Sequence, residues 1–283
     1  LERRGNHMRI GWMLASVMSG VLLLIASPAR AIDEAHRAKA REMADKAAEY
    51  LRKQQDPTSG GSPGASDAAR KPPLPGITAR VLSGLRMDDK SESDPAIGLG
   101  VKYLLNHVQE DGGIYDRLLP SYNTSLAVSA LSKVDLPQAR EAVEKATLFL
   151  KGLQWSEVSN PNAGGNEAPR VVGRDHPFYG GVGYGKHGRP DGSNLNMFMQ
   201  AMQDAGVSPA DESVKRAVTF LQRLQMLDEV NDMPYADKSK QGGFIYATVE
   251  NAESVDGRAG QSMAGTIEES LDDGPPGSRV GAA

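Results

Sequence analysis

The sequence predicts an all-α fold built from repeated helical hairpins, and three observations support this prediction. An aromatic-Leu pair followed by a Gln recurs four times, a Gly-Gly pair follows each copy, and helical patterns of apolar residues flank these motifs. The four copies begin at Tyr50, Tyr103, Phe149 and Phe220. Recurrence every 45 to 71 residues, roughly, indicates a repeat array whose units bury their apolar faces against their neighbours.

The first two repeats each divide into two helical halves. A helix is predicted over 35–55, where small and apolar residues recur at a spacing of three and four, and its partner is predicted over 77–85. The Pro-, Gly- and Ser-rich segment between them predicts a loop. The second repeat pairs a helix over 96–108 with one over 124–131.

The last two repeats differ in completeness. The third pairs a helix over 138–153 with one over 194–204, across a long Gly-rich insertion. The fourth begins with a helix over 211–227, but the segment after Tyr246 is polar and Gly-rich and predicts no second helix. A half repeat leaves an apolar edge, which indicates either that the sequence is a fragment or that a protein partner covers this C-terminal edge.

Composition excludes several functional classes. The chain has 283 residues, 39% of them apolar, and a formal net charge of −4 with scattered Lys and Arg. This distribution argues against nucleic-acid binding and against a polybasic membrane patch. The absence of Cys excludes disulfides, thiolate zinc sites and thiol nucleophiles.

The N-terminus predicts export. Arg9 precedes an apolar run over 10–26, and Ala29-Arg30-Ala31 fits a signal-peptide cleavage site. We therefore expect a signal peptide with upstream residues over 1–31, a repeat domain over 32–249 and a disordered tail over 250–283. The mature protein is expected to be periplasmic or extracellular with no transmembrane span, the alternative being an uncleaved N-terminal anchor.

The motifs resemble those of the prenyltransferase and squalene-cyclase repeat proteins, whose repeats form an α/α toroid. The resemblance covers about residues 40–250 and rests on the aromatic-Leu-x-x-x-Gln spacing, which the second copy exceeds by one residue, and on the Gly-Gly-x-aromatic turn. It implies a partial α/α toroid of about three and a half hairpins. It also implies that the Gln caps a helix end and ties adjacent repeats together, a role suited to orphan backbone groups at a helix terminus.

The catalytic motifs of that family are degenerate in this sequence. In the squalene-hopene type an Asp-x-Asp-Asp-Thr segment opens an inner helix, and its middle Asp protonates the alkene. Asp191 fits the first Asp, but Ser193 and Asn194 stand where the next two would be, and neither is a strong acid. The zinc site of the protein prenyltransferases needs a Cys that this chain does not have. We therefore expect no metal site and no cofactor.

Asp191 is the one weak catalytic candidate, and a set of polar and aromatic residues around the inner-helix starts is predicted to bind a ligand. That set is Tyr122, Asn123, Tyr184, His187, Asp191 and Asn194. The alternative for Asp191 or Ser193 is that it caps the helix beginning at Asn194.

The functional prediction is an exported repeat protein without a recognisable catalytic centre, which binds an apolar, lipid-like molecule or a protein partner. Met197, Met199 and Met202 suit an adaptable apolar site, with core packing as the ordinary alternative. Two enzymatic alternatives remain. One is a terpene cyclase or mutase, an isomerase or transferase that uses a different acid. The other is an α/α-toroid enzyme acting on polysaccharide, in which Asp191 and Tyr184 would be the residues to test.

Overall fold

A computed structural model describes residues 33–63, 74–87, 94–158, 171–185 and 189–248. Their regular structure is helical apart from one small two-stranded sheet, so the all-α class is confirmed, while closure into a toroid stays a prediction. The chain divides into two units, residues 1–50 and 51–283. The predicted signal peptide and tail lie outside the described residues.

Helix α2 (Glu34–Gln54) supplies the described part of the first unit. No residue of this helix is buried, although its sequence is amphipathic. An amphipathic helix gains most of its stability from packing its apolar face, so this exposed face calls for an explanation.

The second unit contains six further helices, close to the ranges predicted from the sequence. They are α3 (Pro75–Arg86), α4 (Pro95–Leu105), α5 (Pro120–Leu131), α6 (Pro137–Gly152), α7 (Gly192–Asp204) and α8 (Glu212–Leu224). Four of them begin with proline, whose fixed φ suits the first helical position and whose missing N–H would be unpaired there anyway.

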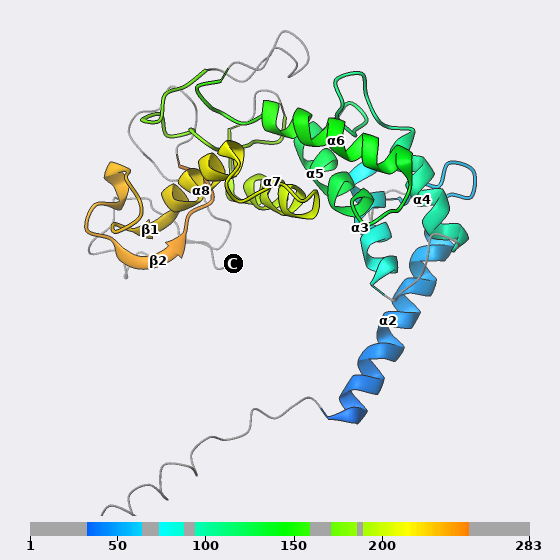
Figure 1. The fold of residues 1–283 in the computed structure, drawn as a ribbon. Coiled ribbons are helices and arrows are strands. Elements are labelled where there is room, and N and C mark those ends of the chain that lie inside the picture. Colours follow the sequence, from blue (N-terminus) through cyan, green and yellow to red (C-terminus); the bar gives the residue numbers. More distant parts are fainter. Residues whose placement is uncertain (1–32, 64–73, 88–93, 159–170, 186–188, 249–283) are drawn as a thin grey trace, which may run out of the picture. The chain divides into compact units, whose positions relative to one another are not determined.

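The second, inner helices of successive hairpins lie side by side. Helix α5 packs against both α3 and α7, and each inner helix also packs on the outer helix that follows it in the chain (Figure 1). The core between these layers contains Leu82, Leu104, Leu131 and Leu150, each almost fully buried. The inner-helix starts therefore gather along one edge of the array.

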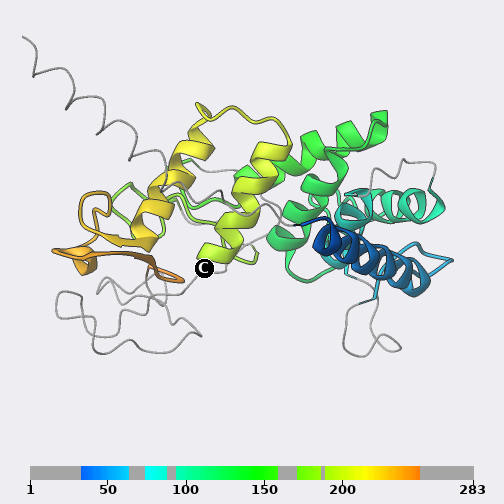
Figure 2. The ribbon, with the colours of Figure 1, turned by 90° about the horizontal axis from the view of Figure 1, so that it is seen from below.

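After α8 the chain leaves the helical pattern. Strand β1 (Gln225–Leu227) pairs antiparallel with β2 (Lys240–Phe244), and a short 3-10 helix, η1 (Pro234–Ala236), lies between them. Figure 2 shows the two strands beyond the end of α8. The prediction of a helix continuing to Leu227 is wrong for its last three residues, because Gln225 takes extended backbone and pairs with Phe244.

A buried arginine anchors the insertion of the third repeat. Arg223, at 1% exposure, donates to the carbonyl oxygens of Arg174 (2.6 Å) and His176 (2.8 Å), and it is ion-paired with Asp232 at 2.6 Å. Nearby Trp155, Val172, Phe178 and Tyr179 form an apolar cluster. The insertion is thus held against α8 by both polar and apolar contacts.

Within the described residues, no helix has the length and apolar character needed to cross a membrane. The apolar run of the predicted signal peptide, residues 10–26, lies outside the described residues.

Candidate functional site

The start of α7 holds Asp191 in a closed hydrogen-bond network. One carboxylate oxygen accepts from the backbone N–H of Asn194 (2.9 Å) and from the Ser193 hydroxyl (2.6 Å), and the other accepts from the Asn194 side-chain amide (2.7 Å). The Asp191 side chain is 2% exposed. Asp191 is therefore the N-cap of α7, as the capping alternative predicted, and its oxygens are committed to the helix start.

Tyr246, from the turn of the fourth repeat, completes the polar cluster. Its hydroxyl oxygen lies 3.1 Å from the Ser193 hydroxyl and 3.2 Å from that of Tyr184. Its carbonyl accepts from the backbone N–H of Gly192 at 2.8 Å. Burial raises the pKa of the Tyr246 hydroxyl well above its ordinary value, so this group stays protonated at neutral pH.

Four of the six predicted ligand-binding residues lie together at this edge. The rings of Tyr122 and Tyr184 are 6.3 Å apart, and Tyr184 connects through Tyr246 to the Asp191–Asn194 cap. The row thus joins the starts of α5 and α7. Whether it binds a ligand stays a prediction.

Asn123 is not part of this row. Asn123 accepts from the backbone N–H of Gly76 (2.7 Å) and donates to the carbonyl of Leu118 (2.7 Å), so it links the first two inner helices. His187 lies outside the described residues.

Tyr246 is not among the site residues predicted from the sequence. The signal was available, because Tyr184 and Tyr246 follow the first glycine of their Gly-Gly pairs by the same number of residues. Tyr115 follows its pair one residue sooner, and its ring instead stacks on Phe149 at 5.7 Å. The length of the turn therefore decides which side of the repeat receives the aromatic ring.

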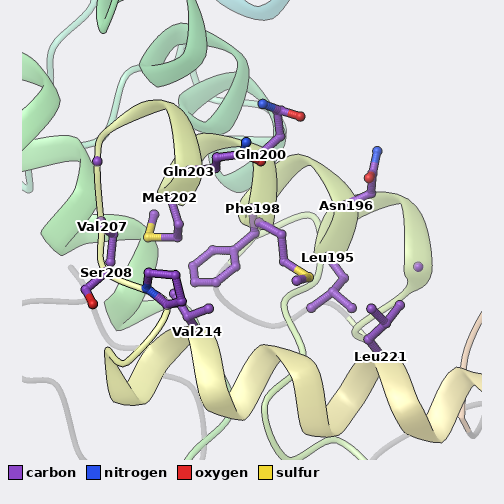
Figure 3. A pocket seen from close by; sticks show the side chains of 14 residues that line it. Leu195, Asn196, Phe198, Gln200, Met202, Gln203, Val207, Ser208, Val214 and Leu221 are labelled. Carbon is purple, nitrogen blue, oxygen red and sulfur yellow. The ribbon is translucent and has the colours of Figure 1, made fainter.

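A pocket of about 580 Å³ lies between α7 and α8. Figure 3 shows Leu195, Phe198 and Met202 directed from α7 toward α8, with Gln200 and Asn196 directed away from it. Val214 and Leu221 close the α8 side (Figure 3). The full lining comprises Gly192, Leu195, Asn196, Phe198, Met199, Gln200, Met202, Gln203, Gly206, Val207, Ser208, Pro209, Val214 and Leu221.

None of the described residues that line the pocket has an ionisable side chain. Its Gly192 end adjoins the Asp191 cap. No group of three or more His, Asp or Glu residues in the described part of the chain could hold a metal ion.

Comparison with known proteins gives one weak relationship. The squalene–hopene cyclase of Zymomonas mobilis is 34% identical over 93 residues, which cover 30% of this chain and 14% of that enzyme. No protein-family model matches the chain. These findings support at most a distant relationship to the cyclase-like repeat proteins, since the chain spans a small part of the relative's length.

Proposed function

We propose that this chain is a binding protein whose α7–α8 pocket takes a compact apolar molecule. The observation that carries the proposal is the chemistry of the pocket wall, where apolar side chains from both helices surround a volume within the range of small-molecule sites. Met199 and Met202 contribute flexible, polarisable side chains that adapt to the shape of a ligand. The proposal includes export, for which the support is the signal-like sequence over 1–31.

The match to a squalene–hopene cyclase favours a second candidate, a cyclase-like enzyme acting on an apolar isoprenoid. A buried acid would have to protonate the substrate, and Asp191 matches the first Asp of the family's motif, whereas Ser193 stands at the place of the proton-donating Asp. Both oxygens of Asp191 already accept hydrogen bonds from Ser193 and Asn194, so they serve to cap α7. The binding proposal is therefore the stronger of the two.

The proposal is tested by titrating the full chain with the neutral apolar fluorophore N-phenyl-1-naphthylamine. We expect saturable binding, and a loss of affinity of about tenfold or more for Met199→Glu, because the new carboxylate would lose hydration in an apolar wall. Binding should also raise the melting temperature of the wild type by mass action.

Met87→Glu is the matched control, because Met87 is 87% exposed at the end of α3 and does not line the pocket. Circular dichroism should show the same helix content for both variants. Equal affinity in Met199→Glu and the wild type would refute the pocket assignment. Conversion of added squalene to a cyclised product, lost in Asp191→Asn, would favour the enzymatic candidate instead.

A further inference from the structure

A single contact rule joins successive repeats. The first glycine of each Gly-Gly pair packs against a backbone carbonyl of the following outer helix. A Cβ on Gly60, Gly112 or Gly180 would lie 2.3, 2.9 or 1.9 Å from the carbonyl oxygen of Leu99, Lys145 or Arg216, respectively. Each of these carbonyls precedes the repeat's aromatic residue by one helical turn.

The second glycine receives the aromatic ring itself. A Cβ on Gly113 would lie 2.9 Å from the ring of Phe149, and a Cβ on Gly181 would lie 2.8 Å from the ring of Phe220. Both rings are nearly inaccessible to solvent. A Gly-Gly pair is therefore a socket that fits the aromatic turn of an outer helix.

The first and the last described repeats break this rule in complementary ways. Tyr50, the aromatic of α2, is 62% exposed. At the other end, no described atom lies within 4 Å of a Cβ placed on Gly242. Gln225 donates to the carbonyl of Gly242 (3.1 Å), as Gln55 and Gln154 donate to Gly60 and Gly180, so this turn has the same contact as those of the first and third repeats.

The sequence of helix α2 also resembles that of an outer helix that does occupy a socket, with six of twelve aligned residues identical. Residues 40–51 of α2 and 139–150 of α6 share Ala, Arg, Glu, Lys, Ala and Leu at equivalent positions. In α6 the small residues Ala139, Ala142 and Ala146 of this segment are buried. Their counterparts in α2 are Ala40, Met43 and Ala47, which are exposed.

We propose that α2 of one copy of this chain packs into the Gly242–Gly243 socket of a second copy, so that the repeat array continues from molecule to molecule. The Lys46 carbonyl would then lie against Gly242, as that of Lys145 lies against Gly112, and the Tyr50 ring would cover Gly243. The interface is head-to-tail, so it produces a closed ring or an open chain of subunits. It is separate from the ligand pocket and does not depend on the proposed ligand binding.

The test is analytical ultracentrifugation of the full chain over a range of concentrations up to about 1 mM, where even weak association is populated. We expect the wild type to exceed the monomer mass as concentration rises. Tyr50→Glu removes the aromatic ring that α2 would insert, and Gly243→Glu blocks the socket. Each variant alone should remain monomeric. Gly243 is suitable because, unlike Gly242, its φ is not positive.

The decisive sample is an equimolar mixture of the two variants. Each dimer formed in it can contain one intact interface, between the α2 helix of Gly243→Glu and the socket of Tyr50→Glu, so the mixture should form dimers and nothing larger. Leu148→Glu is the control, because Leu148 is 66% exposed on an outer helix next to the repeat aromatic. It should associate like the wild type.

A monomeric wild type at all concentrations would overturn the proposal, and so would two monomeric variants that fail to combine. Association that survives both substitutions would show that the copies meet through another surface. Unchanged melting temperatures in the variants would confirm that lost association is not lost folding. None of these outcomes depends on the fluorophore titration, so the two proposals can fail separately.

Discussion

The junction between the third and fourth repeats is built differently from the junction between the second and third. At the junction between the third and fourth repeats, the Gln154 side-chain amide donates to the carbonyls of Gly180 (3.0 Å) and Ser213 (2.9 Å). It therefore connects its own turn to the second residue of α8. At the junction between the second and third repeats, the Gln109 side-chain amide donates to the carbonyls of His107 (3.1 Å) and Tyr115 (2.7 Å), within its own turn.

The junction between the first two repeats follows the pattern of the third and fourth. Gln55 donates to the carbonyls of Gly60 (2.9 Å) and Ala96 (2.8 Å), and Ala96 is the second residue of α4. A cation on the outer helix also pairs there with the capping Asp of the next helix, through Arg52 and Asp94. Lys151 and Asp211 make the corresponding pair at α8.

The difference has a geometric cause. Helix α6 has 16 residues, against 11 in α4 and 13 in α8, and it starts about one helical turn earlier relative to its aromatic residue. Its first carbonyls are therefore displaced from Gln109, while Gly112 still meets the Lys145 carbonyl. The glycine socket is thus the constant part of a junction, and the Gln contact depends on the length of the next helix.

The largest expected effect is on the socket glycines. Gly180→Ala should destabilise the protein by at least ~3 kcal/mol, because its φ is +83° and the new Cβ would overlap the Arg216 carbonyl. Gly242→Ala has a similar φ of +71° but meets no described atom, so only the backbone strain of about 1–2 kcal/mol should remain. Urea unfolding measures both, at concentrations low enough to keep the chain monomeric. Equal losses would mean that the carbonyl contact is unimportant.

The next largest effect on stability distinguishes Gln154, which connects two repeats, from Gln109, whose side chain bonds within its own turn. Gln154→Met keeps the side-chain volume but leaves buried carbonyls unpaired, and it should cost about 2–3 kcal/mol. Gln109→Met alters an exposed, local interaction and should cost less than about 1 kcal/mol. Chemical denaturation of the two variants side by side tests this ranking. A larger loss for Gln109 would show that the second junction relies on its Gln after all.

The smallest effect concerns the ion pair at α8. The Lys151 ammonium and the Ser213 hydroxyl lower the pKa of Asp211 to about 2. A folded-state pKa below the unfolded value of 3.8 means that this contribution is present above about pH 4 and is lost as the pH falls toward 2.

Asp211→Asn keeps a good N-cap but removes the charge, so it should cost roughly 1 kcal/mol at pH 7 and flatten the loss of stability below pH 4. Asp135→Asn, in a highly exposed pair with Arg140, is the control and should change neither quantity. Thermal unfolding from pH 2 to pH 7 provides the measurement. An unchanged acid profile in Asp211→Asn would assign the acid sensitivity to other carboxylates.

The helical class and most of the helix ranges were predictable because the apolar periodicity and the Gly-Gly pairs recur along the chain. The end of α8 was not, because the pairing of Gln225 with Phe244 depends on a strand brought back through η1. Four of the six proposed binding residues fall in one row because they stand at or before the starts of two neighbouring inner helices, α5 and α7. The Met residues of α7 indicated one wall of the pocket. The other wall, Val214 and Leu221, comes from a different helix and could not be predicted from the sequence.

The buried Arg223 has an evolutionary consequence. Its guanidinium is committed at once to Asp232 and to two carbonyls of the insertion, and replacing Asp232 alone would leave a buried cation without its counter-charge. Replacing both residues by apolar ones would in turn leave the carbonyls of Arg174 and His176 without their donor. Lineages that carry this insertion should therefore keep both Arg223 and Asp232.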